Sequence, residues 1–194
     1  MIKGERTRAK LTAATATLLR RQGYHATGLA DIVAASGAPR GSLYHYFPAG
    51  KEALACAALD ESGAAWRQTL DEVIAAAPDL GSAITAVCDV LAQALVASDF
   101  RDGCPLATVA LEAAASSEPV RATVAAHYEA WLALIAARLT DLGVTDGALA
   151  RQLATFTLSA VEGALMLAKV QRSAQPLTDV ATTLRTLAAT LAPG

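Results

Sequence analysis

The chain of 194 residues has only three cysteines, and their spacing gives no sign of a disulfide framework or a zinc site. Cys56, Cys88 and Cys104 are odd in number and far apart, without a C-x-x-C pair. The three histidines show no metal-ligand spacing either. We therefore expect no bound metal and no structural disulfide.

The sequence also lacks the short motifs of common enzyme classes. The segment AGKE at 49–52 resembles the end of a phosphate-binding loop, but no glycine stands five positions before Gly50. Glu52 also occupies the place of the required serine or threonine, and no nucleophile-elbow motif occurs. We expect that the chain is not an enzyme and has no cofactor, with an enzyme on a helical scaffold as the alternative.

Long apolar runs are missing as well. No stretch approaches 18 uninterrupted apolar residues, the length of a membrane-spanning helix, although 54% of the residues are hydrophobic. The first segment, MIKGERTRAK, is basic, but no apolar run follows it as in a signal peptide. The sequence therefore predicts a cytoplasmic protein without a membrane partner.

Apolar residues recur at helical spacing in nearly every segment, and the alternation of a β-strand is sustained nowhere. Alanine and leucine are abundant, whereas aromatic residues make up only 5% of the chain, which suits closely packed helices. A chain of this length can bury a core in one large or two small domains. We expect an all-α fold of about nine helices.

Residues 27–51 carry the most informative pattern, a short helix, a turn at Gly37 and a second short helix. Thr27 is expected to cap the first helix, and Pro39 can open the second at its first position, where the missing N–H is not needed. This order of elements is typical of a helix-turn-helix, which lays its second helix into the DNA major groove.

The second of these helices is amphipathic. At about eight residues it is too short to persist alone, so we expect Leu43 and Phe47 to pack against Ile32 and Val33 of the preceding helix. The opposite face offers donors suited to phosphates and base edges. The residues on that face are Arg40, Gly41, Tyr44 and His45.

A small helical hairpin with one wet face would show the same amphipathicity, but the charge distribution favours a DNA-binding module. Residues 1–51 hold eight basic and two acidic side chains, a formal charge of +6. The remainder holds eight basic and sixteen acidic side chains, a charge of −8. Basic excess confined to one end of an acidic chain is expected for a polyanionic partner.

The segment GYHATGLADIVAASGAPRGSLYHYFPAGKEAL resembles the DNA-binding module of the TetR family of one-component repressors. The glycine turn, the second helix ending in Tyr-x-x-Phe and the following Lys-Glu fall in register, and the match covers roughly residues 6–60. GAPRGSLYHYFP, together with GCPLATVALEAA at 103–114, is similar to the branch of lincomycin-resistance and flavonoid-responsive repressors.

This resemblance implies a helix-turn-helix domain at 1–50 and a ligand-binding and dimerisation domain at 51–194. Gly28, Val33 and Pro39 depart from residues frequent in the family, and Pro39 removes a hydroxyl that could contact a phosphate. Arg40 is the candidate for a guanine edge, and the other matching positions would mainly hold the DNA backbone. The predicted DNA-binding residues are Thr27, Pro39, Arg40, Gly41, Ser42, Tyr44, His45 and Lys51.

Two C-terminal segments predict a dimer. Apolar residues at 149–170 and 177–191 recur at alternating spacings of three and four. The first segment has one apolar face running from Leu149 through Phe156 and Gly163 to Val170, and a second apolar face besides. A helix that is apolar on two sides needs two partners.

A C2 dimer supplies the second partner and matches the two half-sites of such DNA readers, whereas complete burial within one monomer is the alternative. The family also dimerises commonly through its last two helices. The predicted interface residues are Leu158, Val161, Leu165, Leu177, Val180, Leu184 and Leu187.

The resemblance further implies an inducer cavity in the C-terminal domain for a mostly apolar, aromatic or polycyclic compound. Tyr128 and Trp131 lie three apart on one helix face, where their OH and N–H could orient a flat ligand. Each candidate could instead be a packed core residue, with Glu162 paired to an arginine. The candidates are Trp66, Leu91, Phe100, Cys104, Leu111, Tyr128, Trp131 and Glu162.

The sequence as a whole predicts a homodimeric DNA-binding regulator, a repressor that a small apolar or aromatic ligand releases from a palindromic operator. Its expected partners are double-stranded operator DNA, the inducer and a second copy of itself. A redox sensor that uses Cys104 and a structural protein that bends DNA stay open as alternatives.

Overall fold

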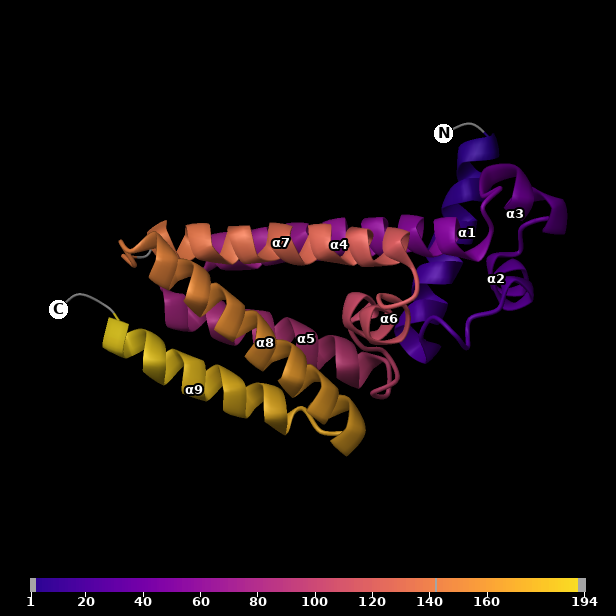
Figure 1. The fold of residues 1–194 in the computed structure, drawn as a ribbon. Helices are drawn as coiled ribbons and strands as arrows, with labels where there is room; N and C mark the ends of the chain where they lie inside the picture. The colour runs from indigo at the N-terminus through magenta and orange to yellow at the C-terminus, as the bar shows by residue number, and fades with distance from the viewer. Residues whose placement is uncertain (1–2, 142, 192–194) are drawn as a thin grey trace. The chain divides into compact units, whose positions relative to one another are not determined.

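The computed structural model describes residues 3–141 and 143–191, and these residues form nine α-helices and no strand (Figure 1). The all-α prediction is thereby confirmed. The helices are α1 (Lys3–Gln22), α2 (Leu29–Ser36), α3 (Arg40–Tyr46), α4 (Lys51–Ala76), α5 (Leu80–Ala97), α6 (Pro105–Ala113), α7 (Glu118–Asp141), α8 (Gly147–Gln171) and α9 (Gln175–Leu191).

The chain divides into two compact units, each built from two separate stretches. Unit 1 comprises Met1–Ala65 and Cys104–His127, and unit 2 comprises Trp66–Gly103 and Tyr128–Gly194. Helices α4 and α7 therefore contribute one part to each unit. The compact unit around the helix-turn-helix extends beyond residue 50, because it also includes α6 and the first part of α7.

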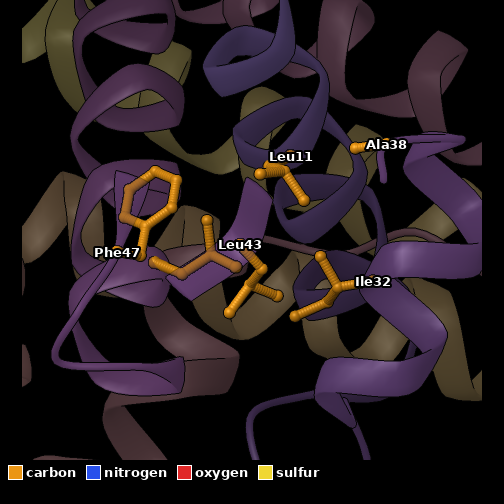
Figure 2. Close-up of a cluster of buried hydrophobic side chains, with 6 residues drawn as sticks. Leu11, Ile32, Ala38, Leu43 and Phe47 are labelled. Carbon is orange, nitrogen blue, oxygen red and sulfur yellow. The ribbon is translucent and has the colours of Figure 1, made fainter. Parts of the chain in front are cut away.

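The core of unit 1 holds the short helix α3 in place. Leu43 and Phe47 are almost completely buried, and they pack with Ile32 of α2 and Leu11 of α1 (Figure 2). Val33 packs against the edge of this cluster, as the amphipathic pattern predicted. Burial of a leucine or phenylalanine side chain stabilises by about 1.5–3 kcal/mol, more than a seven-residue helix could gain on its own.

Helices α2 and α3 each begin one residue later than predicted, whereas α2 ends at the predicted turn. Gly28, not Thr27, is the N-cap residue of α2, and its N–H donates to Asp31 Oδ2 at 3.2 Å. Gly37 ends α2 in the left-handed conformation with φ +61°, which glycine adopts at little cost. Pro39 precedes α3 as its N-cap residue, because the helix begins at Arg40.

In unit 2, helices α5, α8 and α9 pack against one another (Figure 1). The inner face of α8 is formed largely by alanines, which allow the helices to approach closely. The buried residues on these three helices include Ala83, Cys88, Leu95, Ala150, Ala154, Ala164, Leu165, Ala168, Leu177, Ala181 and Leu184.

Three of the seven predicted dimer residues lie in this core and not on an exposed face. Leu165, Leu177 and Leu184 are 7%, 0% and 5% exposed, so they belong to the core of their own unit. Leu187 is 45% exposed. The half-buried residues of the predicted set are Leu158, Val161 and Val180.

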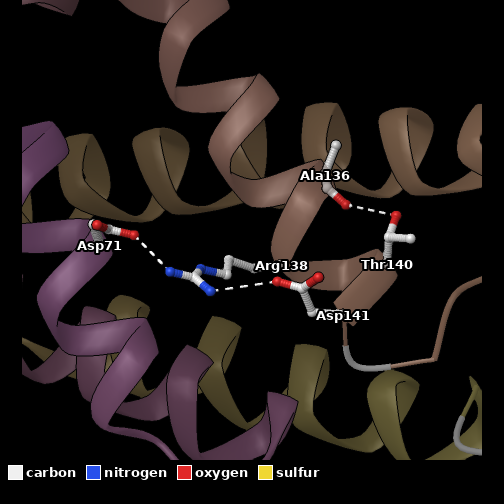
Figure 3. Close-up of polar contacts among 5 residues, drawn as sticks. All are labelled: Asp71, Ala136, Arg138, Thr140 and Asp141. Carbon is white, nitrogen blue, oxygen red and sulfur yellow. Dashed lines mark hydrogen bonds and ion pairs between the residues drawn. The ribbon is translucent and has the colours of Figure 1, made fainter.

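An ion-pair network joins the unit 2 portions of α4 and α7. Arg138 Nη2 donates to Asp71 Oδ1 at 2.9 Å, and Arg138 Nη1 donates to Asp141 Oδ2 at 3.3 Å (Figure 3). Hydrogen bonding to Asp71 raises the pKa of Arg138 further above its usual value. Because solvent screens these exposed groups, the network mainly selects which faces of the two helices meet.

Helices α5 and α8 are long and apolar enough to cross a membrane by length and composition, with mean hydropathies of 1.7 and 1.4. Asp89 interrupts the apolar sequence of α5, and Arg151 is one of three charged residues in α8. Core helices of a helical bundle pass the same test, and the inner faces of α5 and α8 form the core of unit 2.

Candidate DNA-binding interface

The structure places most of the predicted DNA-binding residues on one exposed side of α3. Tyr44 is 61% exposed although it is a large aromatic residue. Ser42 and Lys51 are half-buried, and Thr27 is buried. The exposed members of the set are Pro39, Arg40, Gly41, Tyr44 and His45.

Thr27 is the one predicted contact whose side chain has no accessible surface. Its hydroxyl donates to the carbonyl oxygen of Gly23 at 2.6 Å, and the residue is 0% exposed. In this conformation Thr27 closes the turn between α1 and α2, and its side chain cannot reach a DNA phosphate.

Arg40 opens α3 and extends from an exposed position. Its guanidinium makes no hydrogen bond or ion pair with any other residue that the structure describes. An exposed guanidinium without an internal partner keeps all five N–H donors available, and its planar fork matches the two acceptors of a guanine edge.

Gly41 has no internal reason to be glycine. A Cβ built on it would meet no atom within 4 Å, and its backbone does not adopt a positive φ. Glycine inside a helix costs about 0.5–1 kcal/mol relative to alanine. A destabilising residue on an open helix surface is expected where a partner approaches the backbone closely.

Two further contacts involve residues at the end of α3. The His45 ring packs edge-on against Tyr46, with ring centroids 4.7 Å apart. The Arg8 guanidinium lies 5.3 Å from the centre of the Phe47 ring, which ties α1 to the end of α3. The sequence did not single out Arg8, because a cation above a ring 39 positions away leaves no local pattern.

Lys51 begins α4 and is held by two neighbours. Its Nζ lies 4.4 Å from the centre of the Tyr24 ring and donates to the carbonyl oxygen of His25 at 3.5 Å. Burial lowers the pKa of Lys51, and the Glu112 carboxylate opposes that effect. Lys51 is therefore oriented before any phosphate contact is made.

The eight predicted inducer residues are not all in one place. Cys104 and Leu111 belong to unit 1, and Leu111 is 87% exposed, whereas the other six belong to unit 2. Trp131 is 1% exposed and packs edge-on against Tyr128, with ring centroids 5.5 Å apart. The half-buried members are Trp66, Leu91, Phe100, Cys104, Tyr128 and Glu162.

A groove of about 580 Å³ lies in unit 1, between α1, α4 and the start of α7. None of the predicted inducer residues lines it. Its polar lining includes Arg8, Glu52, Cys56, Asp60 and Glu61.

The three cysteines form no disulfide in the part of the chain that the structure describes, and they differ in environment. Burial raises the pKa of Cys88 to about 11 and also raises the pKa of Cys56, so both thiols stay protonated at neutral pH. Cys104 caps α6, where its Sγ accepts the N–H of Ala107 at 3.5 Å. Within residues 3–141 and 143–191, no three His, Cys, Asp or Glu side chains are grouped to hold a metal ion.

Comparison with known proteins matches both parts of the chain. Residues 11–58 match the bacterial regulatory proteins of the tetR family, and residues 81–183 match the C-terminal domain of LmrA/YxaF-like transcriptional regulators. The chain is 38% identical to the HTH-type transcriptional regulator Rv0196 of Mycobacterium tuberculosis (strain ATCC 25618 / H37Rv) over 185 residues, 93% of each chain. It is 31% identical to the HTH-type transcriptional regulator LmrA of Bacillus subtilis (strain 168), over 89% of this chain and 92% of LmrA.

A solved TetR transcriptional regulator from Chloroflexus aurantiacus J-10-FL is 30% identical, covers 96% of each chain and has a TM-score of 0.80. These relatives are transcriptional regulators and not enzymes, in agreement with the prediction. The chain belongs to the TetR family of transcriptional regulators and has a C-terminal domain of the LmrA/YxaF-like type.

Proposed function

We propose that this regulator is a cytoplasmic homodimeric repressor, which binds a palindromic operator through α3 and is released by a small apolar or aromatic ligand. The observation that carries the DNA-binding part is the surface of α3 itself. Arg40 is exposed and pairs with none of the residues that the structure describes, and Gly41 beside it has open space where a side chain would stand. Both features serve an external partner and neither serves the fold.

The roles on this surface follow from side-chain chemistry. Arg40 would donate to two acceptors of one guanine, which supplies sequence preference. Gly41, Ser42, Tyr44 and His45 would hold the DNA backbone, and Lys51 would supply charge to a phosphate. Pro39 would set the approach of the chain into α3.

The dimer proposal depends on a stripe of α8 that its own unit leaves exposed. The α8 stripe falls within a sector of about 60°, at about 100° per residue, on the side of the helix away from its buried alanines. Phe156 is 53% exposed and Val170 is 77% exposed, both high values for apolar residues. The α8 stripe consists of the exposed Leu149, Phe156, Leu167 and Val170 and of the half-buried Gly163.

Gly163 lies near the middle of the α8 stripe, and a Cβ built on it would meet no atom within 4 Å. A glycine at this position allows a second helix to approach closely. Leu187 of α9, which is 45% exposed, would add to the dimer interface formed by the α8 stripe. A second copy of the chain, related by a two-fold axis, would bury the α8 stripe of each copy. The dimer would then present two α3 helices to two DNA half-sites.

The inducer proposal depends on unit 2, where the aromatic rings of Tyr128 and Trp131 pack edge-on and each carries one polar group. The half-buried Trp66, Leu91 and Phe100 belong to the same unit. An apolar or aromatic compound is the ligand class that such residues favour.

Replacing Gly41 with alanine should separate DNA binding from folding. The added methyl group meets nothing inside the protein, so the free energy of unfolding should stay the same or rise by up to about 1 kcal/mol. DNA affinity should fall about tenfold or more, because the methyl group blocks the approach of the backbone. Urea unfolding and fluorescence anisotropy with a duplex selected by the wild-type protein measure the two effects. Gly147→Ala is the matched control, since its Cβ also enters open space.

Arg40→Ala should cost about 1–3 kcal/mol of binding free energy and relax the preference at one base pair. Gel-shift titration with single-base variants of the selected duplex measures both. Arg121→Ala removes an equal charge from unit 1 at an exposed pair with Glu118, and it should leave the base preference unchanged. An Arg40→Ala protein with unaltered affinity and preference removes Arg40 from the interface, and wild-type binding without any sequence preference favours the DNA-bending alternative.

Phe156→Glu should convert the dimer into a folded monomer, because it places a charge in the α8 stripe without touching the core of unit 2. Leu184→Glu should instead unfold unit 2, since Leu184 is 5% exposed. Light scattering and circular dichroism distinguish dissociation from unfolding. Leu111→Glu, at a residue that is 87% exposed in unit 1, is the control that should change neither. A folded wild-type monomer at micromolar concentration would overturn the dimer.

A flavonoid-like or cationic drug-like compound that releases the selected duplex should also quench tryptophan fluorescence. Trp66 and Trp131 are the only two tryptophans, and Trp131→Phe should lose most of the signal while Trp66→Phe keeps it. If no compound in a broad panel quenches fluorescence or releases DNA, this ligand class is wrong. Release by peroxide alone, abolished in Cys104→Ser, would favour the redox-sensing alternative.

A further inference from the structure

Glu112, at the end of α6, is bonded twice to a residue 87 positions away in the sequence. Its Oε2 accepts the main-chain N–H of His25 at 2.7 Å. Its main-chain carbonyl oxygen lies 3.1 Å from His25 Nε2, which donates to it when that nitrogen carries the proton. The last carbonyls of a helix have no partner within the helix, so the His25 ring caps α6.

The turn between α1 and α2 is shaped around this carboxylate. Gly23 has φ +79°, the left-handed region that favours glycine. A Cβ built on Gly23 would overlap the Glu112 carboxylate. Glycine is therefore required at position 23 both by the backbone conformation and by the space that Glu112 occupies.

The same carboxylate acts on Lys51, one of the proposed DNA contacts. Lys51 Nζ donates to the carbonyl oxygen of His25, so the two sides of one residue are held by Glu112 and by Lys51. The Glu112 charge favours the protonated form of Lys51 against the effect of burial. The ring of Tyr24, in the same turn, lies beside the ammonium group.

A second pair of residues, Ser117 and Glu52, bonds the connection between α6 and α7 to the start of α4. Ser117 Oγ donates to Glu52 Oε2 at 2.6 Å and accepts the N–H of Val120 at the start of α7 at 3.2 Å. Glu112 and Ser117 bracket the connection between α6 and α7. Glu112 is bonded to His25, whose carbonyl oxygen accepts from Lys51, and Ser117 is bonded to Glu52, so both bonds lead to the first turn of α4.

We propose that Glu112 is a positioning residue for DNA binding, which holds the α1–α2 turn and through that turn Lys51, so that the DNA affinity of the protein depends on the end of α6. This inference rests on the proposed DNA-binding function. A protein that populates its binding-competent conformation only in part binds more weakly in proportion, so loss of the Glu112 bonds reduces DNA affinity without removing any DNA contact.

A double-mutant cycle of Glu112→Ala and Lys51→Ala tests the proposal in the full-length protein. The probe is a duplex that the wild-type protein selects from a random-sequence library, and affinity is measured by fluorescence anisotropy at several salt concentrations. Glu112→Ala should weaken binding about tenfold and make the salt slope shallower by about one unit, as Lys51→Ala does. The double variant should bind as the weaker single variant does, within about twofold, because Glu112 acts through Lys51.

Glu112→Gln keeps an acceptor for the His25 N–H but loses the charge beside Lys51, so it should fold normally and weaken binding less than Glu112→Ala does. This variant decides the question if Glu112→Ala does not fold. Glu118→Ala is the matched control, because Glu118 is an exposed carboxylate in unit 1 that pairs only with Arg121 among the contacts described. It should leave affinity and salt slope unchanged.

Three results have distinct meanings. Wild-type affinity and salt slope in both Glu112 variants would overturn the positioning role, even if their thermal stability fell. Additive losses in the cycle would also overturn it, because Glu112 would then act independently of Lys51. Failure of the wild-type protein to retain any duplex would instead overturn the proposed DNA-binding function.

Discussion

The seven-residue helix α3 has no stability of its own in water, so the candidate DNA-binding surface depends on the burial of Leu43 and Phe47. That burial uses only one side of the helix. The other side is left for Arg40 and Gly41, which contribute nothing to the core. The Arg8 contact with the Phe47 ring adds a cation at the edge of the same cluster. The fold therefore determines the orientation of α3, and the function can be carried by residues that the fold does not need.

Helix α8 is likewise divided into a buried face and an exposed face. Its alanine face packs inside unit 2, and the α8 stripe remains exposed on the other side. The periodicity of the sequence revealed that the helix has two apolar faces, but it did not reveal which face the rest of the chain covers. Leu165 belongs to the buried face and Phe156 to the exposed one, a distinction that depends on where α5 and α9 lie.

Local patterns predicted the all-helical fold, the turn at Gly37 and the packing of Leu43 and Phe47, because each depends on residues close in sequence. The same patterns placed the cap of α2 at Thr27, one residue early, since a hydroxyl before a helix usually caps it. Here the Thr27 hydroxyl is bonded back to Gly23 and the Asp31 carboxylate accepts from Gly28 instead. The contact between Glu112 and His25 was beyond sequence reasoning, because no periodicity relates residues 87 positions apart.

The acidic and basic residues of unit 1 have different roles. Residues 1–51 have a formal charge of +6, but the whole of unit 1 contains nine basic and seven acidic residues, a charge of only +2. Three of the acidic residues added beyond position 51 make the long-range bonds of the unit. Glu52 accepts from Ser117, Asp60 from His127 and Glu112 from His25. These carboxylates on α4 and α6 hold the module together, whereas the exposed Arg40 makes no bond with another residue that the structure describes and can meet the proposed DNA. An acidic residue in a DNA-binding unit is not merely unfavourable charge when its oxygens satisfy donors that would otherwise be left without partners.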